Sequence, residues 1–161
     1  MLKSKRKAIG KDITELELGE RLHLTEKIED KDLMLYLGLT NDANPLYLQH
    51  DYAAETIYGQ PIVPPIMLTG IVTAAISKHM PGPGAHIINQ QLHFPKPVYH
   101  YAIVEFVLEV TKLDVAMNQV TIQVDATDQE GERVMSGEIV VIAPQKLPSK
   151  QSQTQELADG N

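Results

Sequence analysis

The sequence predicts an α+β domain in which an antiparallel sheet wraps around one central helix. Two observations predict this fold class. Residues 65–80 are the most apolar stretch of the chain, and they are apolar on nearly all sides of a helix, which indicates a buried helix. Four stretches with strand character follow this helix and one precedes it. A sheet that encloses the helix would bury its whole surface.

The first part of the chain supplies one strand and two helical segments. Residues 20–28 alternate between leucine and polar residues, as a half-buried strand does. Residues 29–40 carry leucines at helical spacing. Residues 50–59 predict a short helix that ends at Gly59. The proline-rich residues 60–65 then form an extended connector, because a residue before proline avoids the helical region.

The second part of the chain contains the central helix and most of the sheet. Pro65 suits the first position of the helix, where its missing N–H group costs nothing. A Pro-Gly cluster at residues 81–86 ends the helix. Alternation of apolar and polar residues then indicates the strands. They are residues 86–94, 102–110, 118–127 and 133–142.

Length and composition indicate a single soluble domain. A chain of 161 residues suits one domain. Because the chain has no cysteine, disulfides and cysteine-based zinc sites are excluded, and a reducing compartment is compatible. No apolar run approaches the roughly 20 residues of a membrane span, so we expect no membrane partner and a cytoplasmic location. No set of histidines has the spacing of metal ligands, so we expect neither a metal nor another cofactor.

Both ends of the chain lack the pattern of a folded core. Residues 1–14 form a basic tail, since five of the 14 Lys and Arg fall within the first eleven residues. An arm for nucleic acid or membrane is one interpretation, but no aromatic residue interleaves with these charges, which favours a solvated tail. The net charge of −7 argues against a nucleic-acid partner. Residues 15–143 form the domain, and the polar residues 144–161 are predicted to be disordered.

Residues 41–68 concentrate the side chains that could carry chemistry. Asp42, an Asn44-Pro45 pair and Tyr47 lie within six positions of one another. A carboxylate of this kind is a candidate general base. The alternative is that Asp42 and Asn44 are ordinary turn or helix-cap residues.

The order of elements and this segment resemble the hot-dog fold of the MaoC-like dehydratases, which include the (R)-specific enoyl-CoA hydratases. The resemblance covers about residues 15–143. It implies a homodimer with thioester sites between the protomers. The residues that match the family are Asp42, Asn44, Pro45, Leu46, Tyr52, Ala53, Gly59, Ile62, Val63, Met67 and Leu68, with Phe94, Pro97 and Val98 matching at a later strand junction.

The resemblance also implies a mechanism. In that family an Asp and a His share the water that adds across a trans-2-enoyl thioester, and a backbone N–H at the start of the central helix binds the thioester oxygen. The resemblance therefore implies that Asp42 is the catalytic base and that Tyr47 stands where the His would be. The substrate-binding residues that it implies are Asn44, Pro45, Ile62, Val63, Pro65 and Met67.

The sequence departs from the family where the chemistry is most sensitive. Tyr47 replaces the His, and a phenol with a pKa of about 10 is a poor proton acceptor at neutral pH. Pro64 and Pro65 replace the His-Gly pair at the helix start, and Pro65 has no N–H to donate. His50 would substitute for the lost His if residues 47–50 were helical; otherwise it begins the next helix on the surface.

These features leave two functions open. The first is an enoyl-thioester hydratase or 3-hydroxyacyl dehydratase. The second is a non-catalytic subunit that binds acyl-CoA or stabilises a partner through a degenerate site. The expected ligand is a thioester of CoA or of acyl carrier protein. The expected assembly is a homodimer or a heterodimer with an active paralogue.

Overall fold

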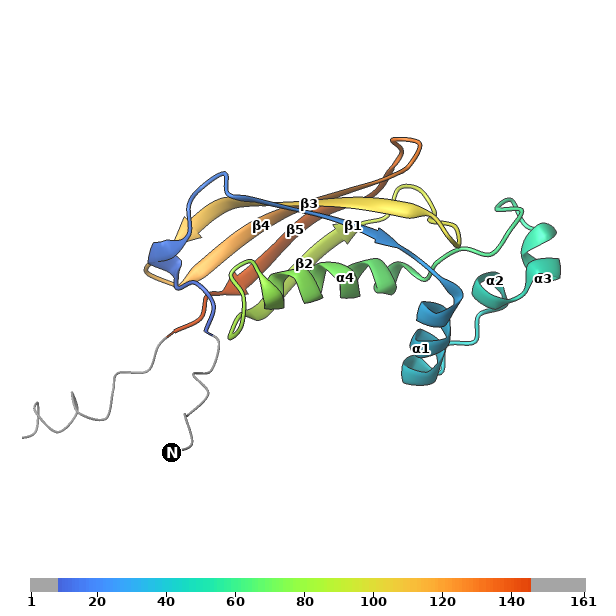
Figure 1. The fold of residues 1–161 in the computed structure, drawn as a ribbon, viewed down its shortest axis with the longest axis horizontal. Coiled ribbons are helices and arrows are strands. Elements are labelled where there is room, and N and C mark those ends of the chain that lie inside the picture. Colours follow the sequence, from blue (N-terminus) through green and yellow to red (C-terminus); the bar gives the residue numbers. More distant parts are fainter. Residues whose placement is uncertain (1–8, 146–161) are drawn as a thin grey trace, which may run out of the picture.

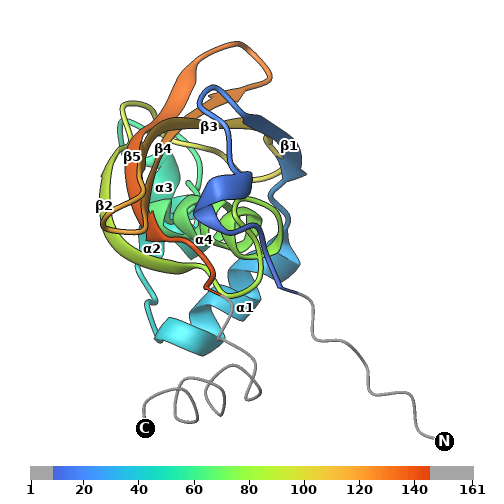
Figure 2. The same ribbon diagram turned by 90° about the vertical axis from the view of Figure 1, so that its left-hand side faces the viewer.

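The computed structural model describes residues 9–145, which form a curved five-stranded antiparallel sheet around one helix (Figures 1 and 2). The strand order is β1-β3-β4-β5-β2. This arrangement confirms the predicted α+β class. The elements in chain order are a 3-10 turn (Ile13–Glu15), β1 (Arg21–Lys27), α1 (Asp30–Thr40), α2 (Pro45–Leu48), α3 (His50–Ala54), α4 (Pro65–Lys78), β2 (His86–His93), β3 (Ile103–Asp114), β4 (Gln119–Asp128) and β5 (Arg133–Ile142).

The core lies between the concave face of the sheet and α4. Alternation along β3 and β4 sends every second side chain to this face. Phe106 and Leu108 of β3 and Ile122 of β4 are fully buried there. Truncating side chains of this kind to alanine typically costs about 2–5 kcal/mol, so residues of these two strands contribute strongly to the stability of the domain.

The central helix α4 is covered on one side only. Val72 and Ile76 are fully buried in the core. On the other side Ile66 is 56% exposed, and Gly70 is exposed as well. The prediction of a helix buried all round is therefore wrong for a single chain. The physical reason is that one sheet can cover only one side of a helix.

Helix α3 is shorter than the helix that the sequence predicts over residues 50–59. The helix predicted over residues 50–59 ends in α3 at Ala54, five residues before Gly59. The Thr56 side chain donates a hydrogen bond of 2.7 Å to the Ala53 carbonyl, and the Thr56 N–H donates to the same oxygen. These bonds satisfy the Ala53 carbonyl at the end of the helix with a local turn. The chain therefore reaches Gly59 outside a helix, and Gly59 has a φ of 72°.

The tails predicted over residues 1–14 and 144–161 lie mostly outside the described residues. Within the described part, Ile13 is only 7% exposed and belongs to the hydrophobic core. Pro144 is also buried. The packed part of the chain therefore includes both residues. In residues 9–145, no helix is long and apolar enough to cross a membrane.

Helices α1, α2 and α3 lie beyond the N-terminal end of α4 (Figure 1). The connector between α3 and α4 holds α2 to the rest of the domain. The Val63 N–H donates to the Val98 carbonyl at 2.7 Å, and Ile62 forms a β-bridge with Tyr99. The Ile62 N–H also donates to the Leu46 carbonyl at 3.2 Å. The connector thus links α2 to the loop that follows β2.

A substitution of Gly137 tests the close pairing of β5 with β2. Gly137 has a φ of 150°, and a Cβ there would lie 2.0 Å from the Gln91 carbonyl oxygen. We expect Gly137→Ala to lower the free energy of unfolding by about 3 kcal/mol, because rigid backbone must move. Urea denaturation measures the loss. Gly70→Ala is the control: its Cβ meets nothing within 4 Å, so it should add about 0.5–1 kcal/mol. Equal effects at the two positions would contradict the close contact.

Candidate active site

The loop after α1 places the candidate residues. Asn41 ends α1 in the left-handed conformation, and its N–H donates to the Leu37 carbonyl at 2.8 Å. Asn44 then caps α2, because its side-chain oxygen accepts a hydrogen bond from the Leu46 N–H at 3.0 Å. Pro45 occupies the first position of α2. The structure thus gives Asn44 the helix-cap role that the sequence left open.

The carboxylate of Asp42 is held from two sides. The Tyr36 hydroxyl donates a hydrogen bond of 2.6 Å to Asp42 Oδ2, and the Asn44 N–H donates to Oδ1 at 3.2 Å. Thr40 supports the arrangement, since its hydroxyl donates to the Tyr36 carbonyl and accepts from the Asp42 N–H. A hydrogen bond from a hydroxyl to a charged carboxylate is short and strong. The half-buried Asp42 side chain is therefore fixed in one orientation.

Sequence analysis missed Tyr36. The only signal was a tyrosine among leucines in α1, whose hydroxyl would need a partner if buried. That partner becomes reachable only because Asn41 reverses the chain after α1. The hydrogen bond to Asp42 raises the pKa of Tyr36 above its ordinary value of 10, and burial adds to the effect. Tyr36 therefore remains a protonated donor at neutral pH.

Tyr47 lies close enough to Asp42 to feel its charge. Burial raises the pKa of Tyr47 above 10, and the negative charge of Asp42 raises it further. A hydrogen-bonding contact with Asn44 acts in the opposite direction and is the smallest of the three effects. The environment of Tyr47 therefore makes its ionisation at neutral pH even less favourable than that of a free phenol. At neutral pH Tyr47 can donate a hydrogen bond but cannot accept a proton.

The start of α4 offers no N–H where the resemblance requires one. Pro64 precedes the helix and Pro65 is its first residue. The Met67 N–H donates to the Pro64 carbonyl at 3.0 Å. The first backbone N–H of this helix therefore belongs to Ile66, one residue later than Pro65.

The candidate substrate-binding residues do not share one cavity. Ile62, Val63 and Pro65 line a pocket of about 270 Å³ beside the loop that follows β2. Met67 lines a different and larger groove of about 520 Å³. Neither lining includes Asn44 or Pro45. The Asn44 N–H instead binds Asp42, and Pro45 begins α2.

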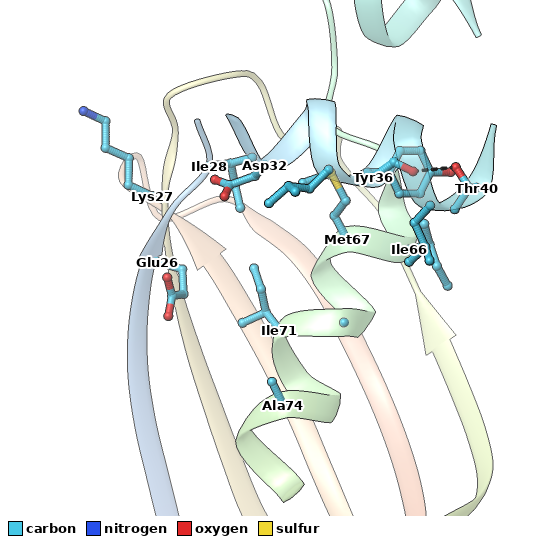
Figure 3. A pocket seen from close by; sticks show the side chains of 13 residues that line it. Glu26, Lys27, Ile28, Asp32, Tyr36, Thr40, Ile66, Met67, Ile71 and Ala74 are labelled. Carbon is cyan, nitrogen blue, oxygen red and sulfur yellow. Dashed lines mark hydrogen bonds between the residues drawn. The ribbon is translucent and has the colours of Figure 1, made fainter. Parts of the chain in front are cut away.

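The larger groove lies between α1, β1 and α4 (Figure 3). Its walls are mostly apolar. Tyr36 and Thr40 lie where α1 approaches the N-terminal end of α4. Because Tyr36 both lines the groove and binds Asp42, the groove begins one side chain away from the candidate base. Its apolar lining residues are Ile28, Leu35, Leu39, Ile66, Met67, Gly70, Ile71 and Ala74.

His50 does not lie on the same helix as Tyr47. Gln49 has extended backbone angles (φ −112°, ψ 111°) and separates α2 from α3. His50 begins α3 and is exposed. The condition for His50 to replace the family's His is thus not met. Residues 9–145 contain no group of three or more His, Asp or Glu side chains arranged to hold a metal ion.

The raised pKa of Tyr36 predicts a specific pH dependence. The hydrogen bond to Asp42 is intact below pH 10 and is lost as the pH rises through the raised pKa of the folded chain. In an ultraviolet titration, we expect the phenolate absorbance of Tyr36, identified as the part that Tyr36→Phe removes, to appear above pH 10. Asp42→Asn should move that absorbance to lower pH, since Asp42 is the largest cause of the shift. A Tyr36 phenol that ionises at or below pH 10 would contradict this contact.

Comparison with known proteins agrees with this architecture. The MaoC-like domain family matches residues 14–132. The (R)-specific enoyl-CoA hydratase of Rhodospirillum rubrum is 32% identical over 130 residues, which cover 81% of this chain and 90% of that protein. The 3-hydroxybutyryl-CoA dehydratase of Methylorubrum extorquens is 32% identical over 132 residues, 82% of this chain and 83% of that protein.

A solved structure gives the same result in three dimensions. The unliganded R-hydratase PhaJ1 of Pseudomonas aeruginosa superposes with a TM-score of 0.79 at 31% identity, over 85% of this chain and 88% of that one. The resemblance that the sequence predicted is therefore confirmed. The chain belongs to the MaoC-like domain family and has its hot-dog fold.

Proposed function

We propose that this chain binds acyl thioesters and adds water to trans-2-enoyl thioesters, or removes it from 3-hydroxyacyl thioesters, with Asp42 as the base. The observation that carries the proposal is the carboxylate of Asp42, oriented by Tyr36 beside an apolar groove. An oriented carboxylate supplies the base, and an apolar groove suits an acyl chain. Relatives named as an enoyl-CoA hydratase and a hydroxybutyryl-CoA dehydratase support the same chemistry.

The proposed step is a proton transfer coupled to formation of a C–O bond. Asp42 takes one proton from a water molecule while the water oxygen bonds to C3 of the enoyl thioester. The electrons of the double bond move toward the thioester carbonyl, and C2 then receives the proton from the Asp42 carboxylic acid. Tyr47, as a protonated donor, would hold the water or the thioester rather than take a proton.

Two missing groups limit the rate. Negative charge that develops on the thioester oxygen needs a donor, and loss of one such donor typically costs about 10²–10³ in rate. Pro65 cannot supply it. Loss of a second acid-base group costs roughly 10²–10⁴. These losses are not additive when residues act as a unit. We therefore infer slow catalysis at this site.

A non-catalytic acyl-thioester-binding or partner-stabilising subunit is the second candidate. The observation that favours it is the combination of two phenols with raised pKa values around a single carboxylate. Such a site retains binding surfaces but has no second group that can accept a proton at neutral pH. Measured turnover separates the two candidates.

We also propose the partner and the setting. The ligand is a thioester of CoA or of acyl carrier protein. The assembly is a homodimer through the edge strand β2, which pairs with β5 on one side only, or a heterodimer with an active paralogue on the same edge. The absence of cysteine suits a cytoplasmic location.

Crotonyl-CoA hydration tests the catalytic proposal. The wild-type chain should hydrate crotonyl-CoA slowly, and Asp42→Asn should abolish this activity. Tyr47→His combined with Pro64→His and Pro65→Gly should raise the rate by about 10² or more, because both missing groups return. Asp51→Asn is the matched control, since it changes an exposed carboxylate on α3. Melting curves must show that each variant is folded.

The outcomes distinguish three cases. Wild-type turnover at or above about 10 per second would show that the site is not impaired. Hydration that survives Asp42→Asn would remove Asp42 as the base. Acyl-CoA binding without hydration, in the wild type and in the restored variant alike, would establish the non-catalytic subunit instead.

Light scattering tests the assembly. At micromolar concentration we expect a particle of twice the 17.9 kDa chain mass. Ile88→Lys should shift the particle toward the monomer, because Ile88 is an exposed apolar residue (46%) on the open edge strand β2. Ile57→Lys is the control, since Ile57 is 95% exposed and lies outside the sheet. A wild-type monomer would refute the dimer.

A further inference from the structure

The apolar groove continues along the central helix. A second cavity of about 280 Å³ lies further toward the C-terminal end of α4 and includes Lys78 and His79 in its lining. The two cavities share Glu26, Ile71 and Ala74. They therefore form one trough between β1 and α4, which we call the β1–α4 trough. At one end the trough is lined by Tyr36, whose hydroxyl binds Asp42. Glu26 lies where the two cavities meet.

Glu26 lies on the face of β1 that is turned toward α4, but it is exposed at the border of the core. Alternation along β1 places Leu22, Leu24 and Glu26 on one face, and both leucines are partly buried against the core. Glu26 is paired in register with Val104, which is fully buried. Figure 3 shows Glu26 on the side of β1 that faces α4, whereas Lys27 points away. An acidic side chain thus stands where this strand's pattern calls for an apolar one.

The Glu26 carboxylate has no compensating partner within residues 9–145. No ion pair or hydrogen bond joins it to another described side chain. It is exposed, so water in the open trough solvates it. A ligand that filled the trough as far as Glu26 would remove the part of this water that lies on the trough side. Desolvation of an unpaired carboxylate is costly, so an apolar ligand should stop short of it.

We propose that Glu26 limits the length of the acyl chain that the β1–α4 trough accepts. The inference rests on the proposed function, which places the reacting carbons beside Asp42. From Ile66 to Ala74 the helix rises about 12 Å, so the trough holds a limited length of chain before the terminal methyl group meets Glu26. The substrates are then short- and medium-chain acyl thioesters, and long chains are excluded by charge rather than by a wall of side chains.

Binding of saturated acyl-CoAs tests this limit without any reaction, because these ligands cannot be hydrated. We would measure affinities by calorimetry for the even-numbered series from butyryl- to myristoyl-CoA. In the wild type, affinity should rise about fourfold per methylene and then stop rising. In Glu26→Leu the rise should continue to longer chains. Glu26→Gln, which keeps the size and removes the charge, should lie between the two.

Glu105→Leu is the matched control. Glu105 is an exposed carboxylate on the neighbouring strand β3, opposite Thr25 of β1 and on the outer face of the sheet. The same substitution there adds the same apolar surface away from the trough, so the chain-length limit should not change. Melting curves verify that the variants are folded, and Glu26→Gln serves as the test if Glu26→Leu does not fold.

The possible results separate this inference from the proposed function. An identical limit in wild type, Glu26→Leu and Glu26→Gln would overturn the role of Glu26 while leaving acyl binding intact. A wild-type affinity that rises through the longest chain would also overturn it. Normal binding with the expected limit but no hydration would overturn only the catalytic proposal. No binding of any acyl-CoA, as when a second copy of the chain covers the trough, would overturn both.

Discussion

One-sided packing of α4 against the curved sheet is the constraint on which the other features depend. Val72 and Ile76 complete the core with the inner faces of β3 and β4, and this contact fixes the helix axis relative to the strands. The sheet leaves the opposite side of the helix uncovered, and a groove separates that side from α1. The trough, its apolar walls and its approach to Asp42 all follow from this arrangement (Figure 3).

Local patterns predicted the parts of the fold that local physics decides. The alternation along residues 118–127 identified β4, and the Pro65 start of an apolar run identified α4. The half-exposed state of α4 was not predictable from its composition, because composition shows what a helix can bury and not what is present to cover it. The contact between Tyr36 and Asp42 was also not predictable, since it depends on a left-handed residue between them.

The candidate site shows how environment and residue type combine. Asp42 retains the position of a general base, but the groups around it only donate hydrogen bonds. Tyr36 and Tyr47 are each pushed further toward the protonated form by the carboxylate that they surround. A carboxylate raises the pKa of a phenol and of an imidazole alike, but the two start from different values. The shift makes an imidazole, with an ordinary pKa of about 6.5, a better base near neutral pH, whereas it moves a phenol, which starts at about 10, further from ionisation. Geometry alone would not reveal this difference.

The hydrogen bonds of the connector before α4 join two regions that the sequence separates widely. Val63 and Ile62 bind the loop that follows β2, while the Ile62 N–H also binds Leu46, the neighbour of Tyr47. The loop that follows the edge strand β2 and the backbone of α2 are thus joined by contacts of the connector's backbone, without any long side chain. Because these contacts are made by the backbone, a substitution that changes only a side chain of the connector leaves them in place, whereas proline at residue 62 or 63 would remove one of the two N–H donors.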